Sequence, residues 1–330
     1  MINKKLILAA TILLLLAIGT SCRGSETSTP QPGQEETINI VVQIFPQYDW
    51  VRQIIGEEHM NRFNLTFLLN SGIDTHSFNP SVSDIVRIKT SDIFMYVGGH
   101  SDSWVYDVLS SADVNPNIMT MNLLNVLGDD VLLKGFCDIE DCDEDHEDDD
   151  DFMADEHVWL SLRFAKIICD AIANMLAEAD PAYAHVYRAN ADAYITKLDN
   201  LDNEFRRVVE SAAVYTLVFA DRFPFRYFLH DYGLNHYAAF RGCSAESEAS
   251  FVTVISLANR LNQLELDVVM VTETSDQSIA RTVISSTDRR DQRILVLDSM
   301  KTVGLGDVRN GVTYLSIMEN NLRVLEEALG

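Results

Sequence analysis

Residues 180–211 read DPAYAHVYRANADAYITKLDNLDNEFRRVVES, the longest helical pattern in the chain. Its apolar residues recur at alternating steps of three and four, which places them on one face of an α-helix. Asp180 is suited to cap this helix, and Pro181 to occupy its first turn. A helix of this length spans about 45 Å and is long enough to brace two lobes, although an ordinary packing helix would show the same stripe. The stripe comprises Ala184, Tyr187, Ala191, Tyr194, Leu198, Leu201, Phe205 and Val208.

Strands alternate with helices on both sides of this helix. Before it, the predicted strands are Ile38 to Val42, Leu65 to Leu69 and Ile93 to Val97, with a helix around Ser83 to Lys89. After it, they are Val214 to Phe219, Tyr237 to Phe240, Val268 to Thr272 and Ile294 to Leu297, with helices at Phe251 to Leu264, Ile279 to Ser286 and within 311–329. This alternation predicts an α/β fold of two parallel-sheet lobes joined by one long backbone helix. Ligands of such sheets bind beyond the carboxyl ends of the strands, here in the cleft between the lobes.

The first residues predict export. Lys4 and Lys5 precede an apolar run from Leu6 to Ile18, which is too short to span a bilayer comfortably and is typical of a signal peptide. Small residues precede Cys22 and resemble the lipobox of bacterial lipoproteins, in which that cysteine is acylated; an ordinary signal peptide with a chance cysteine is the alternative. We therefore expect a signal peptide over 1–22, a polar tether over 23–36, and anchoring outside the cytoplasm by a lipid on Cys22.

Composition excludes one class of partner. The formal net charge of −25 leaves nothing to neutralise phosphates, so nucleic-acid binding is not expected. Apolar residues make up 47% of the chain, which is enough for packed cores. The charge fits a protein that attracts cations, although acidity also serves solubility.

An acidic segment interrupts the first lobe. Thirteen acidic residues lie between Asp138 and Glu156, with Cys142 and His146 among them. Such density self-repels, so a loop is predicted over 138–156. The domain boundaries that follow are 37–179 for the N-terminal lobe with this loop, 180–211 for the linking helix and 212–330 for the C-terminal lobe.

The remaining cysteines divide into three cases. Cys137 and Cys142 are close enough in sequence to form a disulfide in an exported protein. Cys169 lies among apolar residues, which predicts burial as a small hydrophobe. Cys243 lies in a loop after a predicted strand. It could be a metal ligand or a buried or disulfide-bonded cysteine, and both interpretations are kept.

Two short motifs carry histidines. Asp74-Thr75-His76-Ser77-Phe78-Asn79-Pro80 follows the strand that ends at Leu69, and Asp155-Glu156-His157-Val158-Trp159-Leu160 follows the acidic segment. A lone histidine is usually a surface or capping residue, but two such loops in one chain favour a shared site.

With these motifs the chain resembles the metal-binding lipoproteins of bacterial zinc and manganese ABC transporters, over essentially the whole mature sequence. Asp74 to Pro80 looks like the family's first histidine loop and Glu156 to Leu160 like its second. Val296-Leu297-Asp298-Ser299 resembles the strand end that supplies a carboxylate, and Tyr314 to Leu322 resembles the closing helix. The resemblance implies His76, His157 and Asp298 as metal ligands.

One position departs from the family. The register set by Tyr232-Gly233-Leu234 places Arg222 where the family has a third ligand, and a guanidinium cannot bind a metal. Asp221 and Cys243 are the two candidates to replace it. A thiolate at Cys243 would favour zinc, whereas a carboxylate at Asp221 would suit manganese or iron.

The predicted function is capture of a transition metal, zinc ahead of manganese or iron, by a monomeric binding protein that delivers it to the membrane permease of an ABC importer. The resemblance also allows an adhesin. A secreted zinc hydrolase is the rival from another class, but no H-E-x-x-H, G-x-S-x-G or Walker motif is present, so an enzyme is not expected. The acidic segment is open to two readings, weak cation collection and a solvated spacer.

Overall fold

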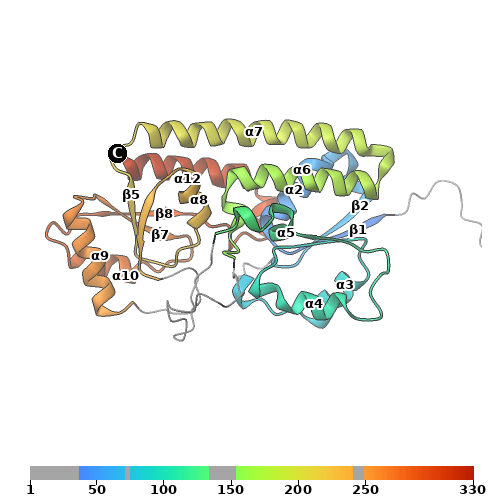
Figure 1. The fold of residues 1–330 in the computed structure, drawn as a ribbon, viewed down its shortest axis with the longest axis horizontal. Coiled ribbons are helices and arrows are strands. Elements are labelled where there is room, and N and C mark those ends of the chain that lie inside the picture. The colour runs from blue at the N-terminus through green and yellow to red at the C-terminus, as the bar shows by residue number, and fades with distance from the viewer. Residues whose placement is uncertain (1–36, 71–74, 134–153, 241–248) are drawn as a thin grey trace, which may run out of the picture. The chain divides into compact units, whose positions relative to one another are not determined.

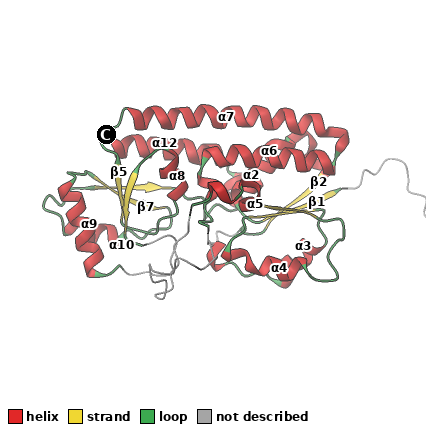
Figure 2. Ribbon diagram, viewed as in Figure 1, coloured by secondary structure: helices red, strands yellow, loops and turns green. Residues whose placement is uncertain are grey.

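The computed structural model describes residues 37–70, 75–133, 154–240 and 249–330. Among them are two four-stranded sheets, and every strand pairing in both is parallel. Helices cover both faces of each sheet (Figure 2). The prediction of two parallel-sheet α/β lobes is confirmed.

The N-terminal sheet has the strand order β2-β1-β3-β4. Its strands are β1 (Ile38–Val42), β2 (Phe63–Phe67), β3 (Ile93–Tyr96) and β4 (Met119–Asn122). Its helices are α2 (Phe45–Ile55), α3 (Val82–Lys89), α4 (Ser103–Leu109), α5 (Leu123–Leu127) and α6 (Leu162–Ala179). The inner strands β1 and β3 are built mainly from buried apolar residues, as expected for strands covered on both faces.

The C-terminal sheet repeats the pattern with the order β6-β5-β7-β8. Its strands are β5 (Thr216–Phe219), β6 (Asn235–Ala238), β7 (Val268–Thr272) and β8 (Arg293–Leu297). Its helices are α8 (Arg226–Asp231), α9 (Phe251–Gln263), α10 (Ser278–Ser285), α11 (Leu305–Arg309) and α12 (Tyr314–Leu329). The inner strands are β5 and β7, and all five residues of β7 are buried.

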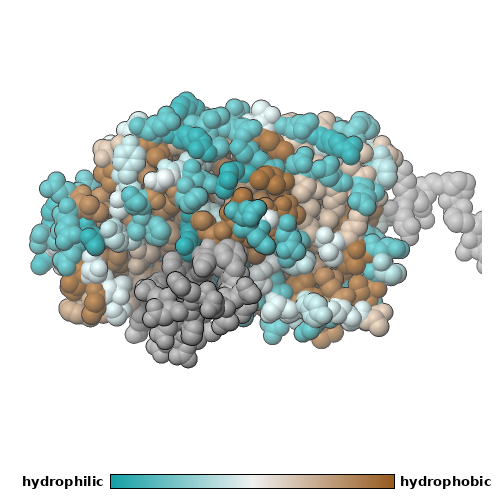
Figure 3. Space-filling model, in the orientation of Figure 1, coloured by the Kyte–Doolittle hydropathy of each residue, from teal (hydrophilic) through white to brown (hydrophobic). Residues whose placement is uncertain are grey.

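The long helix links the two lobes. A 3-10 turn (Pro181–Tyr183) leads into α7 (Ala184–Glu210), which packs on α6 and α2 of the first lobe and on α12 of the second (Figure 1). Tyr187, Leu198 and Phe205 of the predicted stripe have no exposed surface. Hydrophilic residues cover the outer side of α7 (Figure 3). One helix therefore packs against both lobes, within a hydrophobic core that contains residues of each.

Some boundaries differ from the predictions. β2 ends at Phe67 rather than Leu69, and β6 ends at Ala238 rather than Phe240. Helix α6 and the edge strand β4 were not predicted. Cys169 on α6 is fully buried with a free thiol, which confirms its prediction as a core residue.

Several predicted features lie outside the described residues. They are the signal peptide and tether over 1–36 with the lipidation site Cys22, the predicted pair Cys137 and Cys142, residues 138–153 of the acidic segment, and Cys243. Within the part that is described, no helix combines the length and apolar character needed to cross a membrane.

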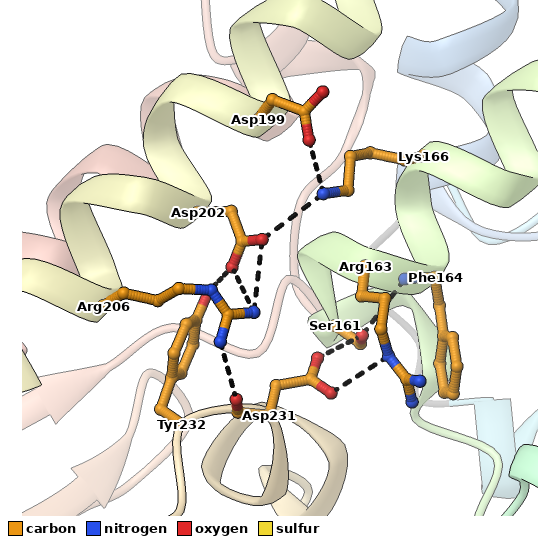
Figure 4. Close-up of polar contacts among 9 residues, drawn as sticks. All are labelled: Ser161, Arg163, Phe164, Lys166, Asp199, Asp202, Arg206, Asp231 and Tyr232. Carbon is orange, nitrogen blue, oxygen red and sulfur yellow. Dashed lines mark hydrogen bonds and ion pairs between the residues drawn. The ribbon is translucent and has the colours of Figure 1, made fainter.

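A network of charged side chains ties α8 of the second lobe to α6 and α7 (Figure 4). The Ser161 hydroxyl caps the start of α6 and donates to the Asp231 carboxylate, which Arg163 also approaches. Asp202 on α7 accepts from Tyr232 Oη at 3.0 Å and pairs with Lys166 and Arg206. The turn that precedes α6 is thus held from the C-terminal lobe.

Asp180 links the start of the long helix to the N-terminal lobe. Its carboxylate accepts from Arg62 Nε at 2.9 Å and from Tyr187 Oη at 2.7 Å, and it is almost fully buried. Burial alone raises the pKa of Asp180, but the hydrogen bonds from Arg62 and Tyr187 outweigh it and hold the pKa below 3.8.

We expect Asp180→Ala to lower the free energy of unfolding by about 3–5 kcal/mol at pH 7, because it removes the carboxylate that pairs with the largely buried Arg62 guanidinium. The folded-state pKa is depressed, so this stabilisation is present above pH 3.8 and is lost as the pH falls through the folded-state value. Urea denaturation between pH 7 and pH 3 measures both effects. Asp113→Ala, which breaks an exposed pair with Lys89, is the control and should leave the stability nearly unchanged. An equal loss in the two variants would contradict the assignment.

Candidate metal site

His76 lies at the carboxyl-end edge of the N-terminal sheet. It sits on a 3-10 turn (Thr75–Ser77) beyond β2, and 30% of its side chain is exposed. Its Nδ1 is 2.8 Å from Ser101 Oγ and 3.7 Å from Glu156 Oε2. The loop that follows β3 therefore anchors the Nδ1 side of this ring.

His157 is buried beside it. It immediately precedes the 3-10 turn Val158–Leu160, and only 3% of the residue is exposed. Asp155 Oδ1 lies 2.9 Å from both its Nδ1 and its backbone N. Burial alone raises the pKa of Asp155, but the charge and hydrogen bonds of His157 outweigh it and lower that pKa, so Asp155 is an ionised acceptor. In the neutral ring this contact favours the proton on Nδ1, which leaves the Nε2 lone pair of His157 for a metal ion; the charged ring carries protons on both nitrogens and must lose the one on Nε2 before it can bind a metal.

The two rings face one another through their Nε2 atoms, which are 3.4 Å apart. The ring centroids are 5.3 Å apart, and Trp159 packs on the other side of His157. The structure thus brings together two residues that are 81 positions apart in the sequence. Both nitrogens suited to metal binding point into one space.

Asp298 follows β8 in the second lobe. One carboxylate oxygen accepts from Met300 N at 2.7 Å, and Asn321 brackets the backbone of Asp298 with two hydrogen bonds. Burial and the nearby Glu273 carboxylate raise the pKa of Asp298 to about 6. The next residue is tied to the histidine segment, because Trp159 Nε1 donates to Ser299 O at 3.1 Å.

Asp221 and Cys243 are the two candidates for a further ligand. Asp221 accepts from Thr272 N at 3.0 Å and from Thr272 Oγ1 at 2.8 Å, and its other oxygen accepts from Arg222 N. Its carboxylate therefore links β5 to β7. Cys243 lies outside the described residues. Among the residues that are described, no group of three or more His, Cys, Asp or Glu side chains is arranged to hold a metal ion.

The sequence did not predict the groups that contact the Nδ1 atoms of the two histidines. Asp155 and Glu156 belong to a quoted motif but had no assigned role, and Ser101 belonged to no motif. A carboxylate two residues before a histidine is the local signal that could have identified Asp155. Ser101 carries no such signal, because its contact with His76 joins separate loops.

The chain is similar to known proteins over nearly its whole length. The family model described as zinc-uptake complex component A, periplasmic, matches residues 40–328. The zinc-binding lipoprotein AdcA of Streptococcus pneumoniae is 27% identical over 291 residues, which are 88% of this chain and 55% of that protein. The high-affinity zinc uptake system protein ZnuA of Bacillus subtilis is 24% identical over 329 residues, 98% of this chain and 96% of the relative.

The solved structures show the same fold. The Zn(II)-bound ZnuA-like domain of Streptococcus pneumoniae AdcA superposes with a TM-score of 0.70 at 26% identity, over 89% of this chain and 99% of that domain. The chain spans only about half of full-length AdcA. The matched family consists of components of an uptake complex, in agreement with the expectation that the protein is not an enzyme. Because the match runs through both lobes and the long helix, the chain belongs to the zinc-uptake complex component A family.

Proposed function

We propose that this protein captures a zinc ion outside the cytoplasm and delivers it to the permease of an ABC importer, as a monomer held at the membrane by a lipid on Cys22. The name of the matched family, periplasmic component of a zinc-uptake complex, supports the transport role. That AdcA is named a lipoprotein supports the anchor. Zinc is the cargo in this proposal and takes part in no reaction.

The observation that carries the proposal is the facing pair of histidines. Zinc binds imidazole nitrogen at about 2.0–2.1 Å with tetrahedral geometry, which separates two ligand nitrogens by about 3.3 Å. The Nε2 atoms of His76 and His157 are 3.4 Å apart. The separation of these two nitrogens therefore already matches that of two ligands on one zinc ion.

Asp298 and Cys243 complete the proposed ligand set. Asp298 offers a carboxylate next to Ser299, which contacts the histidine segment through Trp159. Cys243 is preferred to Asp221 because both oxygens of Asp221 already accept hydrogen bonds. A set of two imidazoles, one thiolate and one carboxylate is softer than manganese prefers, which supports zinc over the alternative cargoes manganese and iron.

Metal content tests the proposal. The full-length chain is loaded with equimolar zinc, manganese and iron, freed of weakly bound ions, and analysed by mass spectrometry. We expect one zinc per chain, and a lower content in Cys243→Ser because that change removes the thiolate. Cys169→Ala removes a thiol from the core of α6 and is the control. Full zinc in Cys243→Ser would reject the thiol ligand, and no transition metal in the unmodified chain would reject the function.

A further inference from the structure

Glu156 lies behind His76 in a position that the proposed ligand set leaves unexplained. One carboxylate oxygen, Oε1, accepts from the backbone N of Ser101 at 2.8 Å. The other, Oε2, is 3.7 Å from His76 Nδ1, the atom that Ser101 Oγ also approaches. A single carboxylate thus contacts both the ring of His76 and the loop that anchors that ring.

We propose that Glu156 is a positioning residue for metal binding, which acts with Ser101 to hold His76 with its proton on Nδ1 and its Nε2 turned toward His157. The inference rests on the proposed function, because it explains how one ligand of that site is oriented. Glu156 itself faces the Nδ1 side of the ring, away from the space between the two Nε2 atoms, and therefore is not a ligand.

The burial of Glu156 requires a compensating role. Only 8% of its side chain is exposed, and His76 is its one ion-pair partner among the described residues. Removing a carboxylate from water is costly unless hydrogen bonds and charge compensate. Here the compensation comes from the Ser101 N–H and from the ring of His76.

The loop after β3 is shaped to admit this carboxylate. Gly99 has a φ of +82°, and a Cβ there would lie 2.5 Å from Glu156 Oε1, so no larger residue fits. On the other side of Ser101, Asp102 accepts from Gly98 N at 2.8 Å and from the side-chain amide of Gln43. Ser101 is therefore held on a braced loop rather than on a free turn.

Each of the two histidines therefore has a carboxylate on the Nδ1 side of its ring. Asp155 contacts Nδ1 of His157 at 2.9 Å, and Glu156 with Ser101 occupies the same side of His76. Outer carboxylates of this kind fix the tautomer and orientation of a metal-binding imidazole and make it more basic. His76 has greater need of this support, because it is the exposed member of the pair.

The test is Glu156→Gln in the full-length chain. Glutamine keeps the length and an oxygen that can accept from Ser101 N, but it removes the charge beside His76. We expect zinc affinity to fall about 10–100-fold, measured by competition with a chromophoric chelator. The matched control is Asp92→Asn, because Asp92 also accepts a backbone N–H, from Asn39, at the amino end of β3. The control should leave zinc affinity unchanged.

Two further readouts separate positioning from a structural role. In a His76→Ala background, Glu156→Gln should no longer change zinc affinity, because the residue through which it acts is gone. In the metal-free chain, ¹⁵N NMR of histidine should report His76 protonated on Nδ1, and a mixture of tautomers in Glu156→Gln. An unchanged tautomer, or an equal loss of affinity in the His76→Ala background, would overturn the inference. The NMR result needs no metal, so it decides this inference even if zinc capture itself fails.

Discussion

Replacing His157 with alanine is expected to lower zinc affinity by more than about 100-fold. Removing an outer carboxylate partner of a ligand costs about 10–100-fold, and removing the ligand itself must cost more. His157 is 3% exposed and already oriented by Asp155, so no neighbouring solvent-exposed group can take its place without moving the buried segment. Competition with a chromophoric zinc chelator measures the loss.

His236→Ala is the matched control for this variant. His236 is a half-buried histidine on β6 that stacks on Phe223, with ring centroids 3.9 Å apart, and it belongs to no proposed ligand set. The control should keep the zinc affinity of the unmodified chain. Equal zinc affinity in His157→Ala and His236→Ala would show that the facing histidines do not bind the ion.

Zinc is expected to stabilise the folded protein by about 4 kcal/mol when its free concentration exceeds Kd 1,000-fold, because the site exists only in the folded state. For a chain of this size, roughly 2 °C of Tm accompanies each kcal/mol, so the shift is about 8 °C. Because the proposed ligands come from both lobes, zinc would stabilise both lobes against unfolding. Thermal unfolding with excess zinc and with a chelator measures the difference.

The control for the stability shift is His157→Ala in the same two conditions, which should show little or no difference in Tm. Magnesium at the same concentration should not shift Tm in the unmodified chain, because it prefers oxygen ligands and retains its water. A zinc-induced shift that persists in His157→Ala would place the ion elsewhere on the protein.

Local patterns predicted the main elements of the fold. The stripe on 180–211 predicted α7 because helical periodicity is a property of neighbouring residues, and Val268 to Thr272 matches β7 residue for residue. The missed elements differ in this respect. β4 (Met119–Asn122) is short and lies at a sheet edge, so it carries no clear pattern. Helix α6 does carry an apolar stripe at helical spacing, with Leu162, Ala165, Ile168, Ile172 and Leu176 buried, and this stripe was the local signal for it.

The metal site was also predictable only in part from the sequence. The two histidine motifs are contiguous in sequence and follow predicted loops, so His76 and His157 could be proposed as partners. The tautomer of His76 could not, because Ser101 and Glu156, the groups that contact its Nδ1, come from other loops. Ser101 is 25 residues from His76 and 55 from Glu156, and no local spacing records those contacts.

The α/β class, the long linking helix and the histidine-bearing loops follow from local patterns, because each depends on residues that are near neighbours along the chain. The packed fold sets the 3.4 Å between the two Nε2 atoms, the hydrogen bonds of Asp221 with Thr272, and the position of Glu156 behind His76. These relations arise where the carboxyl ends of separate strands meet, and the packing of the sheets and helices sets those distances.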